Sequence, residues 1–244
     1  NAMPGITNKI LAHFVKKVFL GYEKAASYFG GSSEKIFTGN PIRKEILEAS
    51  RETAIEKFKL DPMKKTILVS GGSRGARSIN DAMVLVEKEL AIRTDVQLIH
   101  ITGETGYEKF TEQVEKKVLM SDNIKVFPYM HDMPLAMAAA DLAVFRAGAI
   151  GLAELTARGI PSILVPYPYA TANHQEHNAR AVEAAGAAVC IRDRELTGEV
   201  LLEKIEGLLA DESRLQKMKD AAKALGKPNA AKDIAHKVLA LLKK

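Results

Sequence analysis

The sequence has 244 residues, of which 47% are hydrophobic and 27% are charged, and a net charge of +5 at pH 7. This composition is typical of a globular chain with one or at most two hydrophobic cores, and it excludes a disordered protein. The lysines are scattered over predicted helix faces and no groove-reading motif is present, so nucleic acid is not an expected partner. No apolar run approaches the roughly 20 residues of a membrane-spanning helix.

The single cysteine and the first residues indicate the setting of the chain. Cys190 lies in the apolar run AAVCI, which is typical of a buried core residue rather than a reactive thiol. A lone cysteine gives no disulfide framework and favours a reducing compartment, so we expect a cytoplasmic protein. Residues 1–3 (NAM) resemble a remnant of cloning, and the PGITNK that follows suggests a segment taken from a longer protein.

The segment 6–25 is predicted to be an amphipathic helix. Lysines lie opposite apolar side chains that recur at helical spacing, at Ile6, Ile10, Phe14 and Val18. A short strand follows near residues 35–38. One interpretation is a basic helix that lies on a membrane surface. The other, which we favour, makes residues 4–40 the end of a preceding domain plus a link, because the helix leads straight into a strand that has no partner of its own.

From residue 66 onward, short apolar strands alternate with amphipathic helices. The predicted strands are continuously apolar, as in a parallel sheet covered on both faces: 66–70, 96–102, 124–128, 142–146, 161–166 and 187–191. The predicted helices lie between them, near 77–90, 105–118, 133–140, 149–158 and 174–185. Because parallel neighbours need a crossover, this pattern predicts an α/β fold with a doubly wound, Rossmann-like, six-stranded parallel sheet.

The rest of the chain is predicted to be helical, over residues 197–211, 213–225 and, after Pro228, 230–244. We therefore place a ligand-binding α/β domain at residues 41–227 and a C-terminal helix at 228–244. Ligands of open α/β sheets bind outside the carboxyl ends of the strands. Three polar or glycine-rich segments follow strands in this sequence and should lie on one edge of the sheet: 70–78, 146–154 and 166–180.

The first segment, SGGSRGARS, places Gly71, Gly72 and Gly75 where a strand gives way to a helix. Glycines there let backbone amides approach an anion at the start of the helix, which suits a phosphate. The spacing is neither that of a Walker A loop nor that of the GxGxxG dinucleotide motif. A plain tight turn therefore remains an alternative interpretation.

The second segment, RAGAIGLAE, has small residues from Ala147 to Gly151 at another helix start, again suited to a diphosphate. Glu154 follows about one turn later, on a largely apolar helix. A carboxylate at that place can accept two hydrogen bonds from the vicinal diol of a ribose. The alternative is an ordinary solvated glutamate.

The third segment contains TANHQEHNAR, whose neutral amide and imidazole groups suit sugar hydroxyls. His174 and His177 are three residues apart, but no further ligand completes a metal set, so no metal is expected. His174 considered alone is equally typical of a surface residue at a helix start.

Taken together, GNPIR, GGSRGARSIN, RAGAIGLAEL, ARGIPSILVPYP and NHQEHNA occur in the order and at the spacing typical of one family. The sequence resembles the bacterial glycosyltransferase family 28, whose UDP-N-acetylglucosamine transferases convert lipid I to lipid II in peptidoglycan synthesis. The resemblance covers essentially the whole chain after residue 3. It implies a two-domain GT-B fold, of which this chain would be the C-terminal, donor-binding domain together with the end of the N-terminal domain.

The resemblance also implies which residues bind the diphosphate of the donor. Gly72 and Ser73 would do so at the first helix start, and Gly148, Ala149 and Ile150 would do so at the second. Two helix N-termini would stabilise the charge that develops on the departing diphosphate without a metal or cofactor.

Five further residues acquire roles by the same resemblance. Arg43 would lie in the interdomain link near the donor, and Met130 would offer its backbone to the uracil. Glu154 would hold the ribose, while His174 and Gln175 would contact the hydroxyls of the sugar.

The implied reaction is an inverting transfer, in which a sugar hydroxyl of lipid I attacks the anomeric carbon of UDP-N-acetylglucosamine as UDP leaves. No catalytic residue is assigned, because the base and the lipid I contacts would belong to the preceding domain. The full-length protein would work peripherally at the membrane surface, on the inner face of the plasma membrane, and this chain alone should bind the donor without transferring sugar. Two alternatives remain: a UDP-sugar glycosyltransferase for another lipid acceptor, and a UDP-sugar epimerase of related fold.

Overall fold

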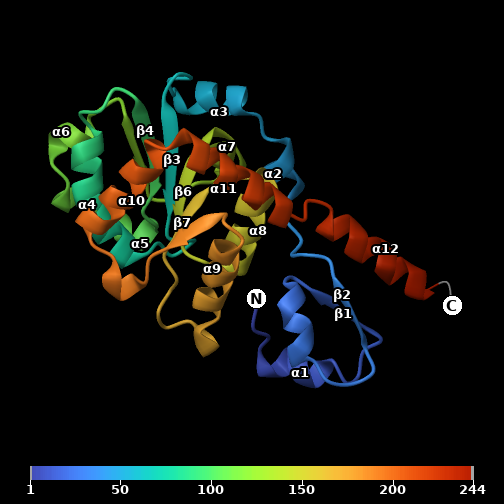
Figure 1. Cartoon of the computed structure of the whole chain (residues 1–244). Coiled ribbons are helices and arrows are strands. Elements are labelled where there is room, and N and C mark those ends of the chain that lie inside the picture. Colours follow the sequence, from blue (N-terminus) through green and yellow to red (C-terminus); the bar gives the residue numbers. More distant parts are fainter. Residues whose placement is uncertain (1, 243–244) are drawn as a thin grey trace.

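The computed structural model describes residues 2–242, and its main body is a parallel sheet with helices on both faces (Figure 1). The six strands are ordered β5-β4-β3-β6-β7-β8, and every neighbouring pair is parallel. They are β3 (Lys65–Ser70), β4 (Val96–Ile101), β5 (Ile124–Phe127), β6 (Leu142–Phe145), β7 (Ser162–Leu164) and β8 (Ala188–Cys190). The predicted doubly wound, six-stranded α/β fold is confirmed. The last two strands are shorter than predicted.

The side chains of the central strand β3 supply both cores of the domain. Ile67 and Val69 belong to one core, and Leu68 belongs to the other, because successive side chains of a strand point to opposite faces. The first core is covered by α4 (Arg77–Leu90), α5 (Glu104–Gln113), α6 (Lys116–Leu119) and α10 (Gly198–Leu209). The second is covered by α2 (Lys44–Glu48), α3 (Arg51–Phe58), α7 (Met133–Ala139), α8 (Ala149–Arg158) and α9 (His174–Ala184). Helices α2 and α3 lie in a region for which the sequence predicted no element.

The N-terminal unit differs from its prediction. Helix α1 (Ile6–Leu11) is short, and the predicted helix 6–25 is wrong beyond it: Lys17–Leu20 form strand β1, which includes Val18. After the 3-10 turn η1 (Glu23–Tyr28), β1 pairs in parallel with β2 (Glu34–Phe37), so the predicted strand near 35–38 does have a partner. The physical reason is that Val18 and Phe19 favour strand, and pairing satisfies backbone groups that β2 would otherwise leave open.

The C-terminal elements agree with the predicted helical tail. Helix α11 (Glu212–Leu225) contributes buried side chains to both cores, and α12 (Ala230–Leu242) extends from the domain toward the N-terminal unit (Figure 1). The expectations for residue 1 and for residues 243–244 lie outside the described residues. The division at residues 4–40, 41–227 and 228–244 remains a prediction. Within residues 2–242, no helix is long and apolar enough to cross a membrane.

Candidate functional site

A large pocket opens at the carboxyl ends of the parallel strands, next to the position where the strand order reverses between β3 and β6. Its volume is about 1380 Å³. The segments after β3, β6 and β7 all contribute to its wall, as the sequence predicted. Eight of the ten predicted site residues line it: Arg43, Gly72, Ser73, Met130, Gly148, Ile150, Glu154 and Gln175. The other two, Ala149 and His174, do not.

The glycine-rich loop between β3 and α4 forms one wall of this pocket. Its turn is closed by the amide of Gly75, which donates to the carbonyl of Gly72 at 2.9 Å. Both residues have positive φ, +90° at Gly72 and +72° at Gly75, a region that favours glycine. A Cβ atom at Gly75 would lie 2.0 Å from the carbonyl oxygen of Thr102, so this glycine is required by close packing as well.

Helix α4 starts at Arg77, directly after this loop, and no side chain caps its N-cap residue, Ala76. Uncapped amides at a helix start can donate to an anion, and the macrodipole of the helix favours negative charge there. Ser73, on the loop, is exposed to the pocket. The loop is therefore suited to a phosphate, as predicted.

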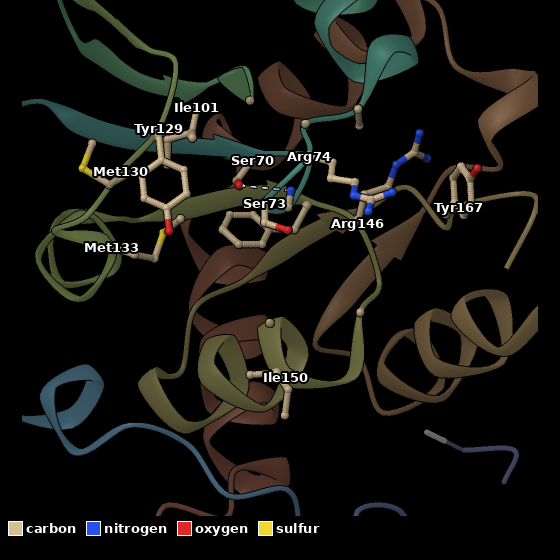
Figure 2. Close-up of a pocket in the computed structure, with 18 of the residues that line it drawn as sticks. Ser70, Ser73, Arg74, Ile101, Tyr129, Met130, Met133, Arg146, Ile150 and Tyr167 are labelled. Atoms are coloured by element: carbon tan, nitrogen blue, oxygen red, sulfur yellow. Dashed lines mark hydrogen bonds between the residues drawn. The ribbon is translucent and has the colours of Figure 1, made fainter. Parts of the chain in front are cut away.

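The second wall is the start of α8. Its N-cap residue Gly148 also lacks a side-chain cap, and a Cβ atom there would have no neighbour within 4 Å. Figure 2 shows Ile150 in the first turn, across the pocket from Ser70 and Ser73 of the glycine-rich loop. Ala149 lies in the same turn, but it does not line the pocket and its carbonyl accepts a bond from Asn40 Nδ2 at 3.4 Å. Two uncapped helix starts thus line one pocket.

Glu154 lies one turn further along α8 and is only 6% exposed, which excludes the solvated-glutamate interpretation. Its Oε1 accepts from Nε and Nη2 of Arg43, each at 3.4 Å. Burial raises the pKa of this carboxyl, and the guanidinium of Arg43 opposes that rise. The structure therefore places a buried carboxylate against a pocket-lining arginine, while the ribose-binding role remains a prediction.

Arg146 follows β6 and bonds to three other segments around the site, and sequence reasoning assigned it no role. It donates to the carbonyls of Val165 and Pro166, both at 3.1 Å, and to the hydroxyl of Ser78 at 2.8 Å. It also forms an ion pair with Asp193 at 2.5 Å. An arginine directly after a buried strand was the only signal in the sequence. Because its guanidinium is held by these groups, it fixes the start of α4, the loop after β7 and the segment after β8 relative to its own loop after β6.

Aromatic and sulfur-containing side chains form the remaining side of the pocket. Figure 2 shows Tyr129, Met130 and Met133 together on one side, with Arg146 and Tyr167 on the other. Met130 is buried, whereas Tyr129 is 44% exposed and packs edge-on against His131 with ring centroids 4.8 Å apart. A flat, apolar base would fit this side better than a phosphate would.

The predicted sugar-binding segment is divided by the structure. Gln175 lines the pocket, and its Oε1 accepts from the amide of Tyr167 at 3.0 Å. His174 instead bonds through Nδ1 to the carbonyl oxygen of Thr171 at 2.8 Å, which orients its ring at the start of α9. Asn178 is buried and donates to the carbonyl of Ala147 at 3.1 Å. The segment therefore supports the loop before α8 as well as lining the pocket.

The charge of the pocket suits an anionic ligand. Arg77 and Arg146 face acidic partners, Asp81 and Asp193, whereas Arg74 forms no ion pair with any residue in 2–242. Within the same described residues, no group of three or more His, Cys, Asp or Glu side chains could hold a metal ion. Positive side chains and uncapped helix amides are therefore the anion-binding groups that the described part of the chain supplies.

The sequence matches the profile of the Glycosyltransferase family 28 C-terminal domain over residues 66–236. The chain belongs to this family. It is 48% identical over 237 residues to the UDP-N-acetylglucosamine--N-acetylmuramyl-(pentapeptide) pyrophosphoryl-undecaprenol N-acetylglucosamine transferase of Desulforamulus reducens, covering 96% of this chain and 64% of that protein. It is 47% identical over 234 residues to the protein of the same name from Acetivibrio thermocellus, covering 96% of this chain and 63% of the relative.

The family 28 domain also resembles a solved structure. The crystal structure of MurG from Acinetobacter baumannii aligns with a TM-score of 0.75 and 26% identity, over 96% of this chain and 63% of that one. The chain thus spans about 64% of the length of the curated relatives. The part that matches the family profile, residues 66–236, includes the loops after β3, β6 and β7 that line the pocket.

Proposed function

We propose that this chain is the donor-binding half of an inverting glycosyltransferase, and that its pocket binds UDP-N-acetylglucosamine. One observation carries the proposal: two uncapped helix starts and the buried carboxylate of Glu154 line the same pocket. The helix starts suit the two phosphates, and the carboxylate suits a ribose diol about one helical turn away. The names of the relatives support N-acetylglucosamine as the transferred sugar.

The geometry suggests what each group would do during transfer. Negative charge accumulates on the diphosphate as the bond to the sugar breaks, and amides at Ser73 and Gly148 would stabilise it through fixed dipoles. The amide of Gly72 donates to Ser70 Oγ at 3.3 Å and would have to exchange that bond for one to the diphosphate. Arg74, which has no ion-pair partner in residues 2–242, would add a positive charge on the same side. These groups interact more strongly with the diphosphate as its charge grows in the transition state than with the intact sugar nucleotide, and this difference lowers the barrier.

The other pocket residues would orient the donor. The backbone of Met130 would hold the uracil beside Tyr129, and Gln175 would contact sugar hydroxyls. Arg43 would retain Glu154 as a carboxylate when the ribose binds, because a nearby positive charge favours the ionised form. His174 would contact the sugar through Nε2, because its bond to the carbonyl of Thr171 uses Nδ1.

The acceptor and the catalytic base would come from the part of the longer relatives that this chain does not cover. Transfer requires both substrates in near-attack geometry, which one half of a two-domain cleft does not supply. We therefore propose lipid I as the acceptor of the full-length protein, peptidoglycan synthesis as its pathway, and the inner face of the plasma membrane as its place of work.

Ligand-dependent thermal unfolding tests the donor assignment. UDP and UDP-N-acetylglucosamine at ~100 times their dissociation constants should each stabilise the chain by roughly 2.7 kcal/mol. ATP and NAD at the same concentrations serve as controls and should give no shift. An equal shift with ATP would contradict the uridine assignment.

A radiolabelled transfer assay with a lipid I analogue tests the division of labour. The chain alone should release no product above the no-enzyme control, while a full-length relative run in parallel should. Conversion of UDP-N-acetylglucosamine without an acceptor would instead favour the epimerase alternative. Sugar transfer to diacylglycerol would favour a different lipid acceptor.

A further inference from the structure

A chain of buried polar side chains lies beneath the glycine-rich loop, outside the pocket. Glu87 and Asn80 of α4 and His100 of β4 are at most 5% exposed. Glu87 Oε1 lies 2.7 Å from His100 Nδ1, and His100 Nε2 lies 3.2 Å from Asn80 Oδ1. The chain ends where Asn80 Nδ2 donates to the carbonyl of Thr102 at 3.0 Å.

The bond from Asn80 to Thr102 determines where the protons of these hydrogen-bonded side chains must be. The carbonyl of Thr102 can only accept, so the amide nitrogen of Asn80 must face it, and the oxygen of Asn80 must face His100. His100 Nε2 therefore carries a proton and donates. Exactly one further proton then lies between Nδ1 of His100 and Oε1 of Glu87, since two lone pairs at 2.7 Å would repel. Burial raises the pKa of Glu87, which favours the carboxylic acid as the donor.

The carbonyl of Thr102 is also the group against which the glycine-rich loop packs. A Cβ atom at Gly75 would lie 2.0 Å from that oxygen, and one at Gly103 would lie 2.5 Å from the Cα of Gly75. On the other side of Asn80, a Cβ atom at Gly106 would lie 2.6 Å from Nδ2. The backbone of the loop, the carbonyl of Thr102 and the amide of Asn80 are therefore stacked in contact, and a shift of one moves the next.

We propose that Asn80, held by His100 and Glu87, is a positioning residue: it sets the position of the glycine-rich loop relative to the carbonyl of Thr102, and so prepares the loop to bind a nucleoside diphosphate. The proposal rests on the proposed donor-binding function. Asn80 touches no ligand itself; it fixes the carbonyl of Thr102, which fixes Gly75 and with it the amides that face the phosphates.

A purely structural role would not require this chemistry. The surrounding core is apolar, and the ring of Phe110 packs edge-on against His100 with centroids 4.7 Å apart. A buried polar cluster costs more free energy than apolar side chains of the same size unless every bond is made, and within residues 2–242 the buried Oε2 of Glu87 has no hydrogen-bond partner. What the polar chain provides, and an apolar one cannot, is a directed hydrogen bond at the carbonyl beneath the loop.

The experiment compares UDP with uridine, because uridine lacks the phosphates that the loop would hold. Asn80→Ala should weaken UDP binding about tenfold in calorimetric titration, since a charged ligand then meets a misplaced loop. The affinity for uridine, followed by ligand-observed NMR, should stay within twofold. Glu87→Met should repeat this pattern. Glu87→Gln should restore UDP binding, because its amide can donate to Nδ1 of His100.

Gln97→Ala is the matched control. Gln97 is as buried as Asn80 and lies on β4, the strand of His100, but it bonds to Thr66 Oγ1 and to the carbonyl of Asp61, away from the pocket. This variant should lower the melting temperature and leave the ratio of UDP to uridine affinity unchanged. In the wild type, NMR should show a slowly exchanging proton on Nε2 of His100.

The outcomes separate the inference from the proposed function. Equal losses for UDP and uridine in Asn80→Ala, an unchanged UDP affinity, or a proton on Nδ1 rather than Nε2 would overturn the positioning role while the donor site stands. A wild type that binds neither UDP nor uridine would overturn both. If Asn80→Ala does not fold, the pair Glu87→Met and Glu87→Gln decides by the same comparison.

Discussion

Two helices begin at the pocket, and their starts are built in opposite ways. The start of α4 is fixed from below: Gly75 packs on the carbonyl of Thr102, and Gly71 lies so close to Ala76 that a Cβ atom would be 2.3 Å from its amide nitrogen. The start of α8 is open, with Gly148 at an ordinary φ of −68° and no neighbour for a Cβ atom. Glycine thus serves packing and turn geometry at the first start, and access for a ligand at the second.

The largest effect should come from Gly75→Ala, which disrupts the tight packing just before the start of α4. The new methyl group would meet a backbone oxygen at 2.0 Å at a residue with φ of +72°. Neither conflict can be relieved by a side-chain rotation, so we expect a loss of more than about 3 kcal/mol in the free energy of unfolding. Chemical denaturation measures it. A loss below ~1 kcal/mol would show that the loop can move away from Thr102.

The next largest effect should come from Glu154→Ala, which removes the buried carboxylate that lies about one turn after the start of α8. If the carboxylate holds the ribose diol, UDP binding should weaken by ~1.5–3 kcal/mol while the fold survives. Asp81→Ala is a suitable control, because Asp81 also lines the pocket but lies on α4 beside Arg77. Titration calorimetry that shows equal losses in both variants would mean that the pocket is disturbed in general and that no bond to the diol is lost, because removal of a negative charge by itself favours an anion.

The pH dependence of uridine binding tests whether the carboxylate of Glu154 binds the ribose diol. Uridine carries the diol but no phosphate that titrates. The pKa of Glu154 is raised by burial, so on acidification the carboxylate should be lost at a higher pH than for an exposed glutamate. Uridine affinity should therefore fall as the pH drops through that raised pKa. Glu154→Gln should bind weakly and show no such fall.

The difference between the two starts also explains what the sequence could predict. Glycines and small residues after apolar strands are visible in the sequence, so Gly72, Gly148 and the edge of the sheet they share were predictable. The burial of Glu154 could be inferred from its apolar helix. By contrast, Asn80, His100 and Glu87 lie on two elements, and no spacing in the chain reports that they meet.

Where sequence reasoning failed, tertiary contacts had outweighed local pattern. Apolar spacing predicted a single helix over residues 6–25, but pairing with Glu34–Phe37 draws Lys17–Leu20 into a strand. His174 does not line the pocket and bonds through Nδ1 to the carbonyl of Thr171, and its role as a sugar ligand stays a prediction. Arg146 was missed because its partners come from three separate segments: the start of α4, the loop after β7 and the segment after β8.

A smaller effect is expected from Gly72→Ala, which lies on the fixed loop but faces open space. Its φ of +90° disfavours a side chain, while no atom lies within 4 Å of a Cβ atom there. The strain alone should cost ~1–2 kcal/mol in the free energy of unfolding, less than for Gly75→Ala, which adds a clash. Denaturation of the two variants side by side measures the difference. Equal losses would mean that conformation, and not packing on Thr102, dominates the first start.

The smallest effect on stability should come from Gly148→Ala, at the open start. The backbone conformation suits alanine and the methyl group meets nothing, so the free energy of unfolding should change by less than about 0.5 kcal/mol, with loss of N-cap preference offset by a less flexible unfolded chain. Binding should respond differently. If the diphosphate lies against this helix start, the methyl group occupies the approach to its amides, and UDP should bind more weakly while uridine binds as before. A variant that retains full stability and full UDP affinity would place the phosphates at α4 alone and leave α8 with only the ribose.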